Sequence, residues 1–110
     1  MNQGIKTVLY SAADMTRAKA LFTKLLGIEP SVDSPYYVGF KVGDQDIGLT
    51  PSGQPGPTAF WHVSDIRTSL QLVLDAGGQI QQAVKDVGGG KLVAAARDAE
   101  GNLIGFVQMP

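Results

Sequence analysis

Few side chains in this sequence can carry out acid–base or metal chemistry, and the single histidine, His62, is the first candidate. An imidazole exchanges protons near neutral pH and binds transition metals, so His62 could donate a hydrogen bond or a proton to a ligand. Because no base or nucleophile lies beside it in the sequence, a histidine bonded only to backbone or water is the alternative. The chain has no cysteine, which excludes disulfides, thiolate nucleophiles and zinc sites made of several Cys or His residues.

Aromatic side chains form a second group of candidates. Tyr36, Tyr37, Phe40 and Phe60 could line a wall for a planar ligand, since aromatic rings bury a large area at a small entropic cost. Tyrosine is also an ordinary strand residue, which is the alternative interpretation. The only tryptophan, Trp61, alternates with Phe60 along the chain, and we expect it to point the other way and pack beneath a helix.

The composition of the chain limits the kinds of molecule that the protein can bind. The chain has 110 residues, of which 44% are hydrophobic and 17% charged, with a net charge of −1, and this predicts one compact domain. A near-neutral charge offers no basic surface for nucleic acid, and no apolar stretch is long enough to cross a membrane. We therefore expect a cytoplasmic protein that binds neither nucleic acid nor membrane.

The sequence contains an internal repeat. The segment TVLYSAADMTRAKALFTKLLGIE from Thr7 matches TAFWHVSDIRTSLQLVLDAGGQI from Thr58 at a constant offset. The identical pairs keep their order along both halves, and they are Thr7 with Thr58, Asp14 with Asp65, Leu21 with Leu72, and Gly27 with Gly78. A repeat of this kind predicts two copies of one supersecondary unit.

Each half begins with a strand and a helix. Alternating residues predict strands over 5–12 and 58–63, with Thr7, Leu9 and Ser11 on one face of the first. Asp14 and Asp65 are in position to cap the following helices, and glycines at 27 and 77–78 end them. Apolar residues at helical spacing predict the buried faces of the two helices, which are Met15, Ala18, Leu21, Phe22, Leu25 and Leu26, and then Ile66, Leu70, Val73 and Leu74.

Short strands separated by turns complete each half. Strands are predicted over 36–42 and 47–50 in the first half, where three fit between the helix and the linker, and over 79–85, 91–97 and 103–108 in the second. The segment 51–57 is too rich in Pro and Gly for regular structure and is predicted to be a linker. The order is therefore βαβββ twice, with module one at about 1–50 and module two at about 58–110.

This arrangement resembles the vicinal oxygen chelate superfamily, which includes glyoxalase I, extradiol dioxygenases, fosfomycin-resistance enzymes and bleomycin-binding resistance proteins. The resemblance rests on the paired modules, on Leu26-Gly27-Ile28 after the first helix, and on the closing RDAEGNLIGFVQ at 97–108. It implies an α+β fold in which the two tandem βαβββ modules form a cupped mixed sheet around a cleft, with the helices outside. The whole chain, 1–110, would be one glyoxalase/bleomycin-resistance-like domain.

Metal-binding members of that superfamily place His, Gln or Glu on the first and last strands of each module. The corresponding positions here are Thr7 and Gly48 in module one, and Thr58 and Gly105 in module two. A hydroxyl or a glycine cannot replace these ligands, so we predict no metal, no cofactor and no catalytic residue. A site built from His62 and turn carboxylates, chosen from Asp33, Asp44, Asp46 and Glu100, is the alternative.

The resemblance and the missing ligands together predict metal-independent binding of a small apolar or aromatic molecule in the cleft, as in antibiotic-binding resistance proteins. The alternative is a glyoxalase-like lyase or a dioxygenase-type enzyme of the same superfamily. Relatives of this size commonly pair, so we expect a homodimer. The predicted ligand-binding residues are Thr7, Leu9, Ser11, Tyr37, Thr58, Phe60 and His62.

Overall fold

The computed structural model describes residues 2–51 and 57–110. The chain divides into two compact units. The first unit is Thr7–Thr58, and the second consists of residues 2–6 together with Ala59–Pro110. Most of the predicted linker, residues 52–56, lies outside the described residues, so the predicted module boundaries stay predictions. Residues 2–6, which the repeat assigns to module one, belong to the second unit.

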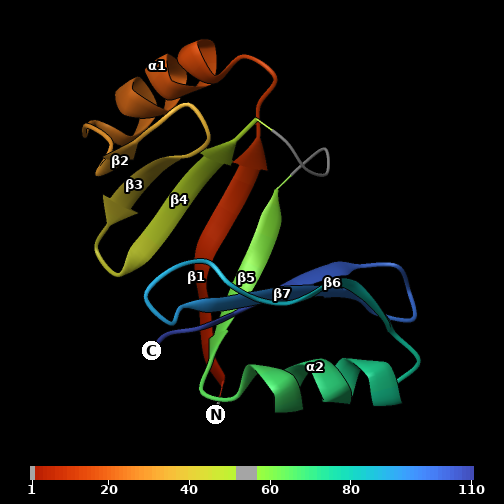
Figure 1. Cartoon of the computed structure of the whole chain (residues 1–110). Helices are drawn as coiled ribbons and strands as arrows, with labels where there is room; N and C mark the ends of the chain where they lie inside the picture. Colours follow the sequence, from red (N-terminus) through yellow and green to blue (C-terminus); the bar gives the residue numbers. More distant parts are fainter. Residues whose placement is uncertain (1, 52–56) are drawn as a thin grey trace. The chain divides into compact units, whose positions relative to one another are not determined.

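The first unit is a mixed sheet with one helix (Figure 1). Its strand order is β2-β3-β4-β1, in which β1 runs parallel to β4 and the other neighbours are antiparallel. The predicted order of a strand, a helix and three strands is confirmed. The elements are β1 (Asn2–Ser11), α1 (Met15–Leu26), β2 (Val32–Asp33), β3 (Val38–Val42) and β4 (Gln45–Thr50).

Helix α1 begins and ends where its capping residues predict. The Asp14 side chain accepts a hydrogen bond from the Arg17 amide at 3.0 Å, which satisfies one of the free amides of the first turn. Gly27 ends the helix in the left-handed conformation, at φ 71°, and its amide donates to the Thr23 carbonyl at 2.9 Å.

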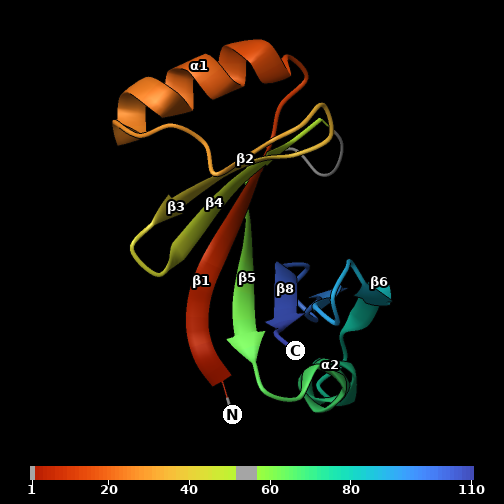
Figure 2. The ribbon, with the colours of Figure 1, turned by 60° about the vertical axis from the view of Figure 1, so that its left-hand side comes forward.

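The core of the first unit lies between α1 and the sheet face that α1 covers (Figure 2). The ring of Phe22 reaches from the helix to Tyr10 and Phe40 of the sheet, with centroids 5.2 and 6.4 Å apart. The prediction that Leu21 and Leu25 join this core is wrong, because they are 59% and 69% exposed. Each precedes a core residue by one position, which turns it about 100° around the helix axis. The helix packs through Met15, Ala18, Phe22 and Leu26.

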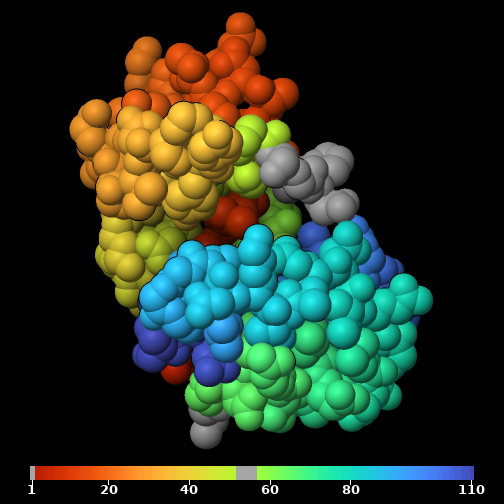
Figure 3. All heavy atoms as spheres, viewed as in Figure 1, coloured from red at the N-terminus to blue at the C-terminus, as the bar shows by residue number. Residues whose placement is uncertain are grey.

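The second unit repeats the arrangement. Its strand order is β5-β8-β7-β6, with β5 parallel to β8 and the other neighbours antiparallel. Helix α2 packs against β6, β7 and β8, and the side chains of α2 and β6, green to cyan, form a continuous surface (Figure 3). The predicted α+β class is therefore confirmed. The elements are β5 (Thr58–Val63), α2 (Ile66–Asp75), β6 (Gln79–Asp86), β7 (Leu92–Arg97) and β8 (Leu103–Gln108).

Helix α2 is fixed at its first turn by Asp65 and by the end of β8. Asp65 accepts from the Thr68 amide at 3.2 Å, and the Gln108 side chain accepts from the Ile66 amide at 2.7 Å. Beneath the helix, Trp61 packs against a core that includes Leu70, as predicted. Leu72, the repeat partner of Leu21, is 66% exposed in the same way.

Two further observations bear on function. The strand predicted from Tyr36 begins only at Val38, because residues 34–37 form a turn in which the Ser34 amide donates to the Tyr37 carbonyl at 3.0 Å. Within the described ranges, neither helix is long and apolar enough to span a membrane.

Candidate functional site

The predicted ligand-binding residues divide between the two units. Thr7, Leu9, Ser11, Tyr37 and Thr58 belong to the first unit, whereas Phe60 and His62 belong to the second. Strand alternation places Leu9 opposite to Tyr10, which packs under α1, and places Phe60 opposite to Trp61, which packs against the core under α2. Each group therefore lies on the sheet face that its helix leaves uncovered.

In the first unit, an aromatic ring covers a pair of glycines. Gly39 and Gly48 are partners across β3 and β4, and Leu9 is the partner of Gly48 on β1. A Cβ atom on Gly48 would lie 2.7 Å from both Cε1 and Oη of Tyr37 and would also collide with Cδ2 of Leu9. A Cβ atom on Gly39 would lie 2.8 Å from Tyr37 Cε2. The Tyr37 ring thus packs directly against Gly39 and Gly48, in space that a side chain at either position would need.

The turn before β3 fixes the backbone of Tyr37. The Ser34 hydroxyl donates to the Tyr37 carbonyl at 3.1 Å and accepts from the Tyr37 amide at 3.1 Å. The Ser34 amide adds a third bond, to the same carbonyl, at 3.0 Å. Serine can hold a turn in this way because its short hydroxyl reaches the local backbone. The ring is therefore held from its backbone and from the glycines beneath it.

The polar groups near this ring carry opposite charges. Lys41 Nζ lies 3.3 Å from Asp46 Oδ1, and Asp46 is the cross-strand partner of Thr7, which is 7% exposed. Burial, and to a smaller extent the negative charge of Asp46, raises the pKa of the Tyr37 phenol. Tyr37 therefore stays protonated at neutral pH and can donate a hydrogen bond.

In the second unit, a phenylalanine takes the corresponding place. Phe60, the repeat partner of Leu9, is the register partner of Gly105 across β5 and β8. A Cβ atom on Gly105 would lie 2.5 Å from Phe60 Cδ1 and 2.7 Å from Cε1. Ala95 is the partner of Gly105 on its other side, so this face carries a ring beside two very small residues. His62 is 8% exposed and lies opposite Val107, two residues further along β5.

The remaining candidates are less well placed. Ser11 is exposed at the end of β1, and Thr58 is partly buried at the start of β5. The predicted aromatic wall is wrong in two of its members. Phe40 is 1% exposed and belongs to the core under α1, and Tyr36 is 80% exposed at the tip of its turn. Alternation along β3 puts Phe40 on the helix side, whereas the turn redirects the residues before Val38.

The positions of the metal ligands in related proteins do not fit a metal in this chain. At Gly48 and Gly105, a side chain would have to enter space that Leu9, Tyr37 and Phe60 already fill. In the part of the chain that the structure describes, no three His, Asp or Glu side chains come together as a set of ligands. These faces are therefore largely apolar, and their polar groups are hydroxyls, the Lys41–Asp46 ion pair and the single imidazole of His62.

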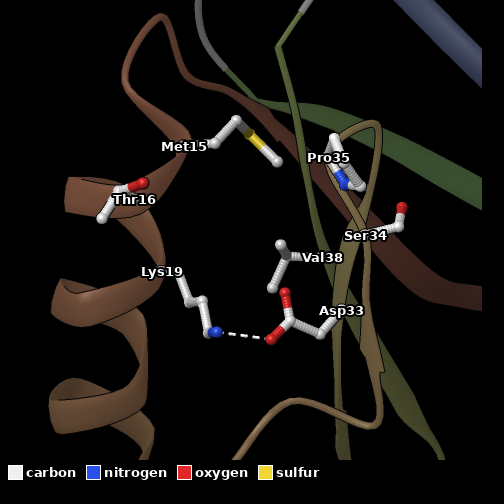
Figure 4. Close-up of a pocket in the computed structure, with 7 residues that line it drawn as sticks. All are labelled: Met15, Thr16, Lys19, Asp33, Ser34, Pro35 and Val38. Atoms are coloured by element: carbon white, nitrogen blue, oxygen red, sulfur yellow. Dashed lines mark hydrogen bonds and ion pairs between the residues drawn. The ribbon is translucent and has the colours of Figure 1, made fainter.

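Each unit also has a surface groove that the sequence did not predict. In the first, a groove of about 450 Å³ lies between α1 and the β2–β3 turn, where Lys19 and Asp33 form an ion pair (Figure 4). In the second, a groove of about 450 Å³ runs along Trp61, Leu72 and Phe106. None of the predicted ligand-binding residues lines either groove. The spacing of Lys19 and Asp33 gives no local signal of their contact.

The fold defines a protein of two βαβββ units, in each of which one helix covers one face of the sheet. The chain belongs to the Glyoxalase/Bleomycin resistance protein/Dioxygenase superfamily, whose family model matches residues 4–106. The resemblance inferred from the sequence is thereby confirmed. No curated protein matches the chain.

Solved structures share this fold at low sequence identity. A glyoxalase/bleomycin resistance protein/dioxygenase superfamily member from Vibrio splendidus is 21% identical, with a TM-score of 0.70 over 94% of this chain and 97% of that one. A hypothetical protein from Bacillus halodurans is 17% identical, with a TM-score of 0.75 over 99% and 95%. Methylmalonyl-CoA epimerase from Mycobacterium tuberculosis is 16% identical, with a TM-score of 0.71 over 99% and 89%. Identities this low establish the fold alone.

Proposed function

We propose that this protein binds a small apolar or aromatic molecule without a metal, on the sheet faces lined by Leu9 and Tyr37 in one unit and by Phe60 and His62 in the other. The observation that carries the proposal is the covering of Gly48 and Gly105 by apolar and aromatic side chains. At the positions that correspond to the metal ligands of the superfamily, this chain has glycines covered by Leu9, Tyr37 and Phe60. Affinity would come from burying that surface, at about 25 cal/mol per Å².

The first experiment measures the binding of 2-ethylnaphthalene, an uncharged aromatic probe, by its fluorescence. We expect the wild-type protein to bind it and Phe60→Ala to bind it about fivefold more weakly, because an aromatic contact contributes roughly 1 kcal/mol beyond its buried area. Phe60→Leu retains apolar volume without the ring, and it tests the same point if the alanine variant does not fold. Tyr36→Ala is the matched control, since Tyr36 is 80% exposed and lies outside the face.

The second experiment is metal analysis of protein purified without chelator. We expect no stoichiometric metal, and the probe affinity should not change when nickel, zinc, manganese or iron is added. One equivalent of any of these metals in the purified protein would reject the proposal. Unchanged probe binding in both Phe60 variants would reject the assignment of this face.

We further propose a homodimer in the cytoplasm. The exposed leucines 21, 25 and 72 leave apolar surface on both helices, which favours association. Light scattering at micromolar concentration should give twice the mass of the chain. A monomer under these conditions would contradict the proposed dimer and leave the ligand-binding proposal intact.

A further inference from the structure

We propose that the Tyr37 hydroxyl donates a hydrogen bond to a neutral oxygen of the ligand, so that the protein selects aromatic ketones and aldehydes over aromatic carboxylates. This inference rests on the proposed function and assigns a chemical class to its ligand. It also gives Tyr37 a role in specificity, in addition to the apolar contact of its ring.

The Tyr37 hydroxyl is held in place without a protein partner among the described residues. The ring lies on Gly39 and Gly48, and the Ser34 turn holds its backbone. Among the described residues, no atom forms a hydrogen bond with the Tyr37 hydroxyl, although the side chain is partly buried. A donor that is held in place and has no protein partner among the described residues loses little entropy when a ligand oxygen accepts its hydrogen bond.

The surroundings of the Tyr37 hydroxyl disfavour an anion. Asp46 places a negative charge near the phenol, and Lys41 forms an ion pair with Asp46 at 3.3 Å. A ligand carboxylate would face that negative charge without a cation of its own, whereas a ketone oxygen carries no net charge to repel. The phenol itself remains a donor, because burial raises its pKa.

The shape of the surface beside the hydroxyl limits where a ligand can carry its oxygen. Leu9 lies against the same glycine as the ring, so the hydroxyl stands at the border of an apolar surface formed by two side chains. A planar ligand lying on this surface would bring an oxygen substituent at its edge to the phenol. The oxygen therefore has to be attached directly to the aromatic body or one bond away from it.

The experiment compares three naphthalene probes that share one ring system. These are 2-ethylnaphthalene, which has no acceptor, 2-acetylnaphthalene, which has a neutral one, and 2-naphthoate, which is an anion. Wild-type protein should bind the acetyl probe about fivefold more tightly than the ethyl probe, as expected for one hydrogen bond. Tyr37→Phe should abolish this preference, so that the acetyl and ethyl probes bind this variant with equal affinity. Tyr36→Phe, which removes an equivalent hydroxyl from an exposed neighbour, should keep it.

The anion gives an independent test. Asp46→Asn removes the negative charge and releases Lys41, so 2-naphthoate should bind this variant at least about fivefold more tightly than it binds the wild type. Binding of both neutral probes with equal affinity by the wild type, or an unchanged preference in Tyr37→Phe, would overturn the role of Tyr37 while leaving the proposed function standing. A wild-type protein that binds none of the probes would overturn both.

Discussion

The same strand position is covered in two different ways in the two units. In the second unit, Gly105 lies beneath a single ring, that of Phe60 on the neighbouring strand. In the first unit, Gly48 lies beneath Leu9, the repeat partner of Phe60, and also beneath the ring of Tyr37, which comes from the turn before β3. The side chain over the glycine is entirely apolar in the second unit, whereas in the first unit the side chains over the glycine include the hydroxyl of Tyr37.

This difference indicates how the repeat has diverged. Both halves keep a glycine opposite the first strand, and both fill the space above it with hydrophobic atoms. In the second unit, Phe60 alone fills the space above Gly105. In the first unit, the shorter Leu9 fills only part of the space above Gly48, and the ring of Tyr37 fills the rest. An aromatic ring over a glycine in a sheet also replaces the contacts that the missing side chain would have made. The duplicated scaffold thus acquires a polar group on one side only.

The largest expected effect on the free energy of unfolding comes from replacing Gly105 or Gly48 by alanine. Gly105→Ala should lower the free energy of unfolding in urea by about 1–3 kcal/mol, because the new methyl group collides with Phe60. Combined with Phe60→Ala, the same change should cost much less than the sum of the two single effects. The destabilisation by Gly48→Ala should be only partly relieved when it is combined with Tyr37→Ala, because the new methyl group still collides with Leu9.

The comparison between the two glycines supplies the control. Strict additivity of Gly105→Ala and Phe60→Ala would contradict the packing of this ring against the glycine. Complete relief of Gly48→Ala by Tyr37→Ala alone would contradict the double cover in the first unit. Circular dichroism and the fluorescence of the single tryptophan, Trp61, can both follow the unfolding.

The sequence predicted the elements well, because each of them has a local cause. Asp14, Gly27 and Asp65 form their predicted caps, and the alternation around Trp61 correctly placed it under a helix. It did not predict where Leu21 points, since the apolar residues of this helix form an arc wider than the face that packs on the sheet.

The covered glycines could not be predicted either, although their positions were identified. Whether a glycine opens space or is covered depends on a ring that reaches it from another strand or turn, and that distance does not appear in the sequence. The turn that exposes Tyr36 and places Tyr37 on Gly39 is held by the hydroxyl and the amide of Ser34. For the same reason, the binding role of the candidate residues stays a prediction.

A smaller effect distinguishes the two helix caps. Asp14→Ala should lower the free energy of unfolding by about 1 kcal/mol, since Asp14 accepts one amide bond at the first turn of α1. Asp65→Ala should cost more, because Asp65 also accepts from the Thr68 hydroxyl at 2.8 Å. Thr68→Val removes that hydroxyl and should make the two losses equal.

The pH dependence sharpens the comparison of the caps. Hydrogen bonds from Thr68 lower the pKa of the Asp65 carboxyl in the folded protein, so Asp65 stabilises the fold above its unfolded pKa, near 4, and this stabilisation is lost as the pH falls below it. The difference between wild type and Asp65→Ala in urea unfolding should therefore shrink between pH 5 and about pH 2. An equal difference at all pH values would show that the carboxylate is not the stabilising group.

The smallest expected effect tests the surroundings of Tyr37 from the alkaline side. Burial raises the pKa of its phenol in the folded protein, so the unfolded chain loses this proton first as the pH rises through about 10. Wild-type stability should then fall more steeply between pH 9.5 and 11 than that of Tyr37→Phe, and Tyr36→Phe should follow the wild type. Lysines titrate in the same range in all three proteins, so only the differences between them report on Tyr37. The same dependence of unfolding free energy on pH in Tyr37→Phe and the wild type would mean that the phenol is as well solvated in the folded protein as in the unfolded chain. Packing on Gly39 and Gly48 would then not bury the hydroxyl.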